Sequence, residues 1–405
     1  MAEKSKKPAI RFAGFTDAWE QRKLGEIYEV NNERNAGQYS IEKTLSIATM
    51  TFNEQGNGAD VSSLSKYKVL RVGDLAFEGH TNKEFRYGRF VLNNLENGIM
   101  SPRFTTLRPI IKQDFNFWEY YIHSERVMRS KLVNATKSGT MMNELVPVDL
   151  FRQLILLPKM PEQTKIGGYF KHLDNLITLH QRKYDKLVNV KKAMLEKMFP
   201  KDGADVPEIR FKGFTEAWEQ RKLGDITSLI TKGTTPLDKS NLGNVNFIKI
   251  ESIDESSGEI TITQKITYEE HEGYLRRSQL KESDILFSIA GTLGRVASVK
   301  SNILPANTNQ ALAIIRLKND ELQYIKTYLK GKVVSDYIKK NPTIGAQPNL
   351  SLAQVGSLKI ALPIFDEQKK IGIYFENLDN LITLHQRKLE KLKNLKKACL
   401  EKMFV

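Results

Sequence analysis

The chain has 405 residues, of which 40% are hydrophobic and 27% charged, and its formal net charge is +15. This composition is typical of a soluble globular protein with two or three domains, and no apolar run approaches the ~20 residues of a membrane-spanning helix. The first residues carry charge without an apolar stretch behind them, which excludes a secretory signal there. The single cysteine, Cys399, excludes an internal disulfide, and we therefore expect a cytoplasmic protein.

The positive charge is unevenly distributed along the chain. Residues 28–150 hold 15 Lys and Arg against 14 Asp and Glu, and residues 227–355 hold 16 against 13. The rest of the chain holds 31 against 20. A basic protein often binds a polyanion such as nucleic acid. In this chain, local polar patches within two near-neutral segments would have to provide such binding, with help from the basic remainder.

In chain order, the first distinctive segment is a short repeat. The sequence PAIRFAGFTDAWEQRKLGEI begins at Pro8 and returns from Pro207 as PEIRFKGFTEAWEQRKLGDI. Internal repeats at a long, fixed spacing indicate the architecture of the whole chain. This repeat predicts two copies of one structural unit.

A variable segment of mixed α/β character follows each short repeat. In the first, KVLRVGDLAFEG and GRFVLNNLENGIMSPRFTTLRP alternate strand formers with turns, and residues 116–136 are expected to form one helix. The second has the same order: NFIKIESID, the strand-and-turn run 279–302, QALAIIRLK, and an expected helix over residues 320–341. The two segments differ in sequence, so we interpret them as related domains with different targets.

A long repeat ends each half of the chain. Residues 166–199 and 371–404 share 26 of 34 positions, and their apolar residues recur at alternating spacings of four and three. This heptad pattern, without an internal proline, predicts two helices of roughly 50 Å each that pair antiparallel. The sequence PKDGADVP after the first helix predicts a linker.

In both copies, polar residues occupy two positions of the apolar heptad stripe, which we call the seam. They are His180 with His385, and Lys191 with Lys396. The His rings can simply pack while their polar tips reach solvent. Alternatively, His180 and His385 meet near the middle of the antiparallel pair and fix its register, as polar seam residues do in coiled coils.

Polar, Gly-bearing loops recur at matching places in the two variable segments. Each could be an ordinary solvated turn, but their side chains are of the kinds that bond phosphates and base edges. The candidate DNA-binding residues are Thr81, Asn82, Arg86, Arg89, Lys137, Ser138, Thr140, Asn143, Lys232, Thr234, Thr235, Thr292, Arg295, Gln347 and Asn349.

Motifs for catalysis are scarce. The sequence contains no G-x-x-x-x-G-K-[ST] run and no H-E-x-x-H, and its six histidines and one cysteine do not have metal-ligand spacing. The NPTI at Asn341 lacks the second proline and the aromatic residue of the N-P-P-[YF] loop of amino-methyltransferases. We therefore expect no catalytic residues and no metal site in this chain.

The order of these motifs resembles the specificity subunit of type I restriction–modification systems. The resemblance rests on the duplicated FxGFTxAWEQRKLGxI, on LPxxxEQxKIGxYF before each long helix, and on LDNLITLHQRK within it, and it covers nearly the whole chain. It implies an α+β protein with two pseudo-symmetric α/β target recognition domains joined by two long antiparallel coiled-coil helices. The expected boundaries are 1–155 and 201–360 for the domains, and 156–200 and 361–405 for the helices.

The resemblance also implies partners and a division of labour. Each domain would read one half of a bipartite site in double-stranded DNA, with the helices setting the gap and docking two modification (methyltransferase) subunits. Restriction (translocase and nuclease) subunits would complete the complex. S-adenosylmethionine, ATP and Mg would be bound by those partners, with no cofactor in this chain.

Two alternatives from other classes remain open at the level of sequence. A two-armed protein-interaction scaffold would use the coiled coil as its working surface without reading DNA sequence, and the near-neutral segments support it. A standalone DNA-binding repressor is the other alternative, although the sequence shows no helix-turn-helix signature.

Overall fold

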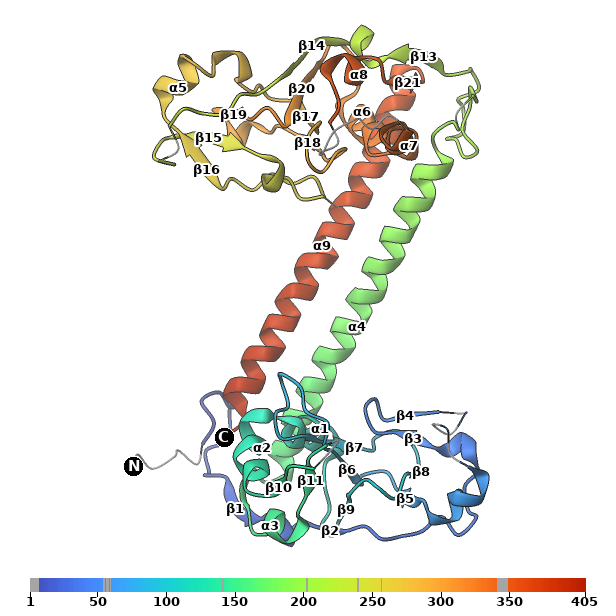
Figure 1. Ribbon diagram of the computed structural model, residues 1–405, viewed down its shortest axis with the longest axis vertical. Coiled ribbons are helices and arrows are strands. Elements are labelled where there is room, and N and C mark those ends of the chain that lie inside the picture. The colour runs from blue at the N-terminus through green and yellow to red at the C-terminus, as the bar shows by residue number, and fades with distance from the viewer. Residues whose placement is uncertain are drawn as a thin grey trace. The chain divides into compact units, whose positions relative to one another are not determined.

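The computed structural model describes residues 7–53, 55, 58, 60–139, 142–201, 203–238, 240–255, 257–340 and 349–405. These residues form two compact units (Figure 1). The first unit comprises Met1–His180 and Lys388–Val405, and the second comprises Gln181–Arg387. Each unit therefore combines one variable segment with part of each long helix.

The first unit is built around a mainly antiparallel set of strands. Its largest sheet has the order β2-β9-β6-β7, and the pairs β1-β12, β3-β4, β5-β8 and β10-β11 accompany it. The strands are β1 (Glu20–Lys23), β2 (Tyr28–Val30), β3 (Leu45–Ser46), β4 (Thr51–Phe52), β5 (Lys68–Leu70), β6 (Leu75–Glu78), β7 (Arg89–Leu92), β8 (Gly98–Met100), β9 (Thr106–Pro109), β10 (Thr136–Lys137), β11 (Glu144–Leu145) and β12 (Leu154–Leu157). The predicted strands over residues 68–109 are confirmed.

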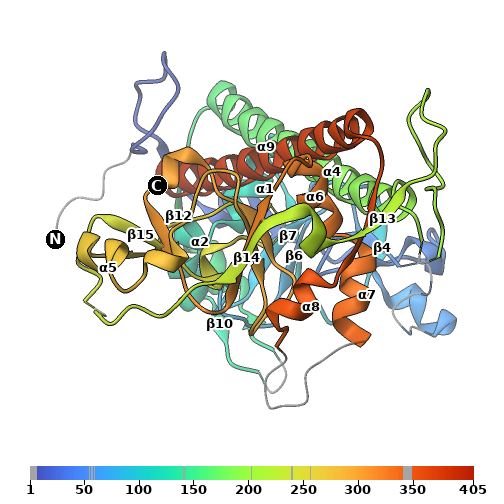
Figure 2. The same cartoon turned by 90° about the horizontal axis from the view of Figure 1, so that it is seen from above.

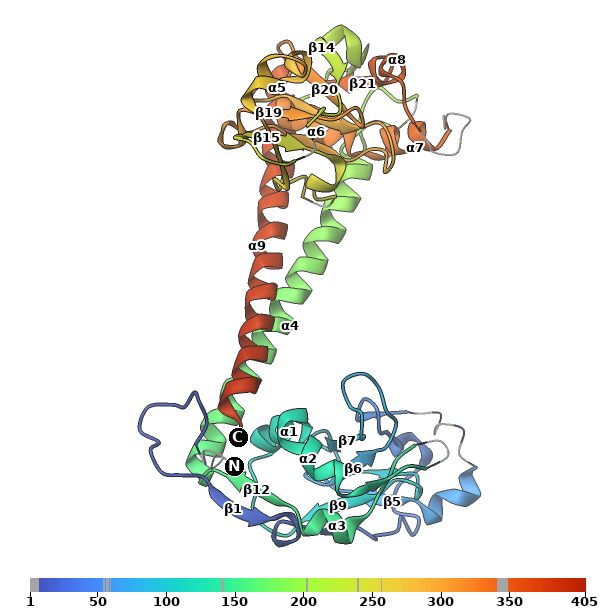
Figure 3. The same ribbon diagram turned by 60° about the vertical axis from the view of Figure 1, so that its left-hand side comes forward.

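The helix predicted over residues 116–136 is two helices. They are α1 (Phe115–His123) and α2 (Glu125–Val133), and a short α3 (Pro147–Phe151) follows. Ser124 between α1 and α2 is extended, with φ −69° and ψ 113°, which ends one helix and starts the next. Serine competes for backbone hydrogen bonds and favours helix ends, which explains the break. Figure 3 shows α1 and α2 beside the ends of the long helices in this unit.

The second unit repeats this plan. Its sheet β14-β20-β17-β18 matches β2-β9-β6-β7 strand for strand, and it adds a sheet β16-β15-β19 and the pair β13-β21. The strands are β13 (Glu219–Lys222), β14 (Thr227–Lys232), β15 (Val245–Ile248), β16 (Gln264–Ile266), β17 (Ile285–Ser288), β18 (Val296–Ser298), β19 (Ala306–Thr308), β20 (Leu312–Leu317) and β21 (Lys359–Leu362).

The helices of the second unit also split where one was predicted. They are α5 (Tyr268–Glu272), α6 (Leu322–Leu329), α7 (Lys332–Lys340) and α8 (Leu352–Gly356). Gly331 lies at the break between α6 and α7, where glycine is unfavourable for a continuous helix. Figure 2 shows α5 and β15 on one side of this unit and α7 and α8 on the other.

Both long repeats are helical, as the heptad pattern predicts. They are α4 (Met160–Lys197) and α9 (Phe365–Met403), which begin several residues before the repeated segment itself. In the second unit, Ile371, Phe375 and Leu378 of α9 are buried. Within the described ranges, no helix has both the length and the apolar character needed to cross a membrane.

Each unit buries the end of the long helix that belongs to the other half of the sequence. Phe404 is 1% exposed in the core of the first unit, and Phe199 is 5% exposed in the core of the second. The two residues occupy the same place in the long repeat. The folded core of each domain therefore depends on residues far from its own variable segment.

The short repeat docks on the start of the long helix in both units. β1 pairs with β12 and β13 pairs with β21, in equivalent registers. Arg11 makes a two-pronged ion pair with Glu162 of α4 (2.6 and 2.7 Å). Arg210 does the same with Glu367 of α9 (2.7 and 2.8 Å). The duplicated sequence therefore attaches each domain to its long helix.

The seam lysines have partners on the opposite helix. Lys396 of α9 contacts both carboxylate oxygens of Asp174 of α4 at 2.6 and 2.8 Å in the first unit. Lys191 of α4 pairs with Asp379 of α9 in the second unit. An ion pair at a seam position favours one axial alignment of two helices. These pairs therefore indicate a register-setting role for the two lysines.

We expect Asp174→Lys to lower the stability of the first unit by about 1–2 kcal/mol, because it places two cations together on the seam. The double variant Asp174→Lys/Lys396→Asp should recover most of the loss. Thermal unfolding followed by circular dichroism measures both effects, and Asp379→Lys with Lys191→Asp is the matched set in the second unit. A double variant no more stable than the single one would contradict the register role.

Candidate nucleic-acid interface

Strand order places the polar loops of the second unit at one edge of its sheet. β14 and β17 are both antiparallel to β20, which lies between them, so they run in the same direction. Lys232 at the end of β14 and Phe287 near the end of β17 face the same β20 residue, Ala313. The loops that follow β14 and β17 therefore leave the sheet at the same edge, beside the residues that precede β20.

The loop after β14 is packed tightly on this edge. The Thr234 N–H donates to the Thr308 carbonyl at 3.1 Å, and the Thr235 hydroxyl donates to Gln310 at 2.6 Å. A Cβ on Gly233 would lie only 1.8 Å from the Thr308 carbonyl oxygen. Glycine at this position therefore permits the close approach, and the loop is held in one place.

The loop after β17 meets the segment that precedes α8. Leu350 donates its N–H to the Ile289 carbonyl at 2.8 Å, and Ala290 bridges Asn349 in antiparallel fashion. Thr292 lies in the same loop and is exposed. Two of the loops singled out in the sequence are therefore in contact.

The first unit brings its two equivalent loops together in the same way. The loop after β6 contacts the β10–β11 hairpin, where the Asn143 N–H donates to the Gly79 carbonyl at 2.9 Å. A Cβ on Gly79 would lie 1.9 Å from the Asn143 carbonyl oxygen, so glycine is again needed for the approach. The hairpin replaces the loop expected over residues 137–147.

Two of the three candidate arginines, Arg89 and Arg295, bond to residues of their own domains. Arg89 pairs with Glu78 at 2.5 Å and donates to the Ala48 carbonyl at 2.9 Å. Arg295, at the equivalent place, donates to the carbonyls of Ile250 (3.3 Å) and Ile253 (3.0 Å). In this geometry, both arginines position a neighbouring segment of the domain.

The other candidate side chains divide by exposure. Asn143 and Thr234 are partly buried, and the Asn82 side-chain oxygen accepts from two N–H groups of its own turn. Thr140 and Gln347 lie outside the described residues. The exposed candidates are Thr81, Asn82, Arg86, Lys137, Ser138, Lys232, Thr235, Thr292 and Asn349. Their contact with DNA remains a prediction.

The histidines of the seam are partly buried, His180 in the first unit and His385 in the second. Their proposed meeting and register role remain a prediction. The ion pairs of Lys191 and Lys396 described above supply a register signal within each unit that does not involve them.

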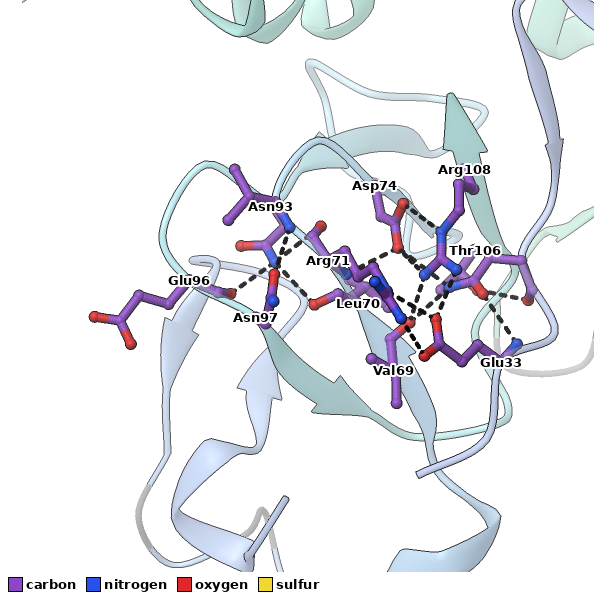
Figure 4. A network of polar contacts seen from close by, with 12 residues as sticks. Glu33, Val69, Leu70, Arg71, Asp74, Asn93, Glu96, Asn97, Thr106 and Arg108 are labelled. Atoms are coloured by element: carbon purple, nitrogen blue, oxygen red, sulfur yellow. Dashed lines mark hydrogen bonds and ion pairs between the residues drawn. The ribbon is translucent and has the colours of Figure 1, made fainter. Parts of the chain in front are cut away.

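A buried ion pair supports the loop-bearing strand in each unit, and the sequence analysis did not identify it. Asp74 precedes β6 and takes two hydrogen bonds from Arg108 of β9, at 3.1 and 2.8 Å (Figure 4). Asp284 precedes β17 and takes two from Arg316 of β20, both at 2.7 Å. In both units an Asp stands just before one strand, and an Arg follows 34 or 32 residues later in the strand that pairs with it. This similar spacing could have indicated the pair.

Glu33 extends this network in the first unit. It accepts hydrogen bonds from Arg71 and Arg108 (Figure 4). The hydrogen bond from Arg71 is the main reason that the pKa of Glu33 falls to about 2, with Arg108 contributing further. The carboxylate therefore stays ionised throughout the physiological range and holds residues 31–33 against β9.

The fold and the paired loops define a class of protein: an α+β chain with two similar domains, each of which presents polar loops at one sheet edge and is mounted on a long helix. A family model described as the type I restriction modification DNA specificity domain matches residues 215–394. That range contains all of the second variable segment, residues 227–355, and most of α9.

Curated relatives point to the same family. The putative type I restriction enzyme MjaX specificity subunit of Methanocaldococcus jannaschii is 29% identical over 199 residues, which is 47% of this chain and 46% of that protein. The MjaVIII specificity subunit of the same organism is 25% identical over 291 residues, which is 69% of this chain and 67% of that protein. The match thus spans less than half the length of the first relative.

A solved structure supports the fold across the whole chain. The S subunit of a type I restriction–modification system from M. genitalium aligns over 98% of this chain and 99% of its own, with a TM-score of 0.57 and 14% identity. The chain is similar to type I restriction–modification specificity subunits in sequence over the matched ranges, and to the M. genitalium S subunit in fold over nearly its whole length. The expected fold class is confirmed.

Proposed function

We propose that the chain is the DNA-specificity subunit of a type I restriction–modification complex. Each domain reads one half of a bipartite site in double-stranded DNA through the loops at its sheet edge. The observation that carries this proposal is the recurrence of the same loop pairing in both units, in a chain with a matched DNA specificity domain. Loops specify by meeting base edges, while phosphate contacts supply much of the affinity.

The long helices set the gap between the half-sites and dock two modification subunits. The chain itself is non-catalytic and binds no cofactor. Methylation with S-adenosylmethionine belongs to the modification subunits, and the restriction subunits use ATP and Mg for translocation and cleavage. We infer a cytoplasmic location from this division of labour, because the complex acts on DNA. It also explains how near-neutral domains can bind DNA, since the partner subunits contribute contacts to the phosphates.

Asn349→Ala tests the reading role of the second domain. Asn349 is exposed where the segment before α8 meets the loop after β17. An asparagine paired with a base edge contributes about 1–3 kcal/mol of discrimination, so we expect a tenfold to hundredfold relaxation at one position of the second half-site. Competition binding with single-base variants of the site measures it. Equal weakening on every sequence would contradict base reading by Asn349.

A further inference from the structure

A second polar feature adjoins the loop edge of the second unit. It is a cavity of about 590 Å³ lined by Thr235, Lys249, Glu251, Gln264 and Asn309, among others. None of these residues except Thr235 was a candidate in the sequence analysis. The cavity therefore raises the question of what a polar hollow does beside the proposed reading loops.

Strand directions explain why these residues converge. β15 and β19 are parallel, so Lys249 after β15 and Asn309 after β19 lie at the same edge of the three-stranded sheet. β16 is antiparallel to β15 and pairs Gln264 with Phe247, which brings the start of β16 to that edge. Asn309 also leads into β20. The cavity is thus continuous with the edge of the four-stranded sheet, where Thr235 lies.

Two side chains in this cavity lack the partners that a purely structural role would supply. The Gln264 side-chain oxygen is buried and accepts no hydrogen bond from the residues that the structure describes. An unsatisfied buried acceptor costs about 1–3 kcal/mol, which a ligand or water can offset. The partly buried Lys249 has no carboxylate within 4 Å among the described residues, although Glu251 lines the same cavity.

Two arginines of the same domain, in contrast, have hydrogen-bond partners within it. Arg295 and Arg316 are both occupied by carbonyl or carboxylate partners of the domain. Lys249 and Gln264 instead offer an ammonium group and a carboxamide to the cavity. Lysine pairs with the O6 and N7 atoms of guanine, and glutamine with the N6 and N7 atoms of adenine, in the major groove of DNA.

We propose that this cavity is a base-reading subsite of the second domain, in which Lys249 and Gln264 contact base edges of double-stranded DNA and determine specificity. The inference rests on the proposed function and deepens it. It extends the reading surface from the loops after β14 and β17 to the edge of the sheet β16-β15-β19. The second half-site is therefore read from two adjoining sheet edges.

Sequencing of the bound fraction of a random duplex library tests the subsite. The complex of the chain with its modification partner is used for wild type, Gln264→Ala, Lys249→Ala and Gln264→Glu. Lys281→Ala is the matched control, because Lys281 is exposed and precedes β17, at the opposite end of that strand from the reading loop. Thermal unfolding of each variant verifies that the domain remains folded.

We expect both alanine variants to lose tenfold to hundredfold discrimination at one or two base pairs of one block, while the other block and the control stay as in wild type. Gln264→Glu should change the preferred base, because a carboxylate can only accept hydrogen bonds. Unchanged blocks in all variants would overturn the subsite while the proposed function stands. Uniformly weaker binding of Lys249→Ala with a shallower salt dependence would reassign that residue to a phosphate contact. If the DNA bound by the wild-type complex showed no enriched motif, the proposed function itself would be overturned.

Discussion

Phe404→Ala is expected to destabilise the first unit by about 3–5 kcal/mol and to leave the second unit unchanged. Phe404 is 1% exposed, and its ring lies 5.4 Å from Tyr121, 5.6 Å from Phe170 and 6.0 Å from Phe117, between ring centroids. Removal of the ring leaves a cavity among aromatic side chains that cannot easily close. The loss is a large part of the stability of a typical domain.

The repeat supplies a matched variant. Phe199 occupies the same place in the second unit, with centroids 5.7 Å from both Tyr324 and Phe375. Phe199→Ala should therefore destabilise the second unit alone. Hydrogen exchange followed by mass spectrometry reports on peptides from each unit separately. Equal loss of protection in both units after either substitution would contradict the assignment of separate cores.

The second large effect concerns the mounting of each domain on its helix. Arg210→Ala should cost the second unit about 3–5 kcal/mol, because it leaves the carboxylate of Glu367 buried without its charged partner. The Glu367 side chain is 0% exposed, and that of Arg210 is 15% exposed. Arg11→Ala should have the same effect in the first unit, where Glu162 is 2% exposed.

A surface pair in the same repeat serves as the control for this prediction. Arg221 and Glu219 are 3.4 Å apart, with side chains 49% and 69% exposed. Exposed pairs contribute 0–1 kcal/mol, so Arg221→Ala should leave chemical denaturation almost unchanged. If Arg210→Ala lowered the free energy of unfolding no more than Arg221→Ala does, the buried ion pair would not be what holds the domain on its helix.

The architecture was largely predictable because periodicity and repetition are properties of the sequence itself. The heptad spacing predicted α4 and α9, and turn residues separated the strands β5 to β9. Helix breaks were missed because a serine at 124 or a glycine at 331 is tolerated within helices, and only packing decides whether it ends one.

The candidate site was predictable only as a set of loops. That Gly79 meets Asn143, or Ile289 meets Leu350, depends on strand pairing between distant residues, which no local pattern contains. The same limit applies to Arg89 and Arg295, whose carbonyl partners come from other segments. The cavity beside Gln264 is lined by separate segments between residues 235 and 309 that only the folded domain brings together, so no motif indicated it.

A binding selection tests directly whether this one chain presents two DNA-reading domains. The purified chain with its modification partner is incubated with a random duplex library, and the bound fraction is sequenced. Two reading domains should enrich a split motif of two short defined blocks separated by an undefined gap of fixed length. Absence of any enriched motif, with binding that simply falls as salt increases, would contradict it and favour a protein-interaction scaffold.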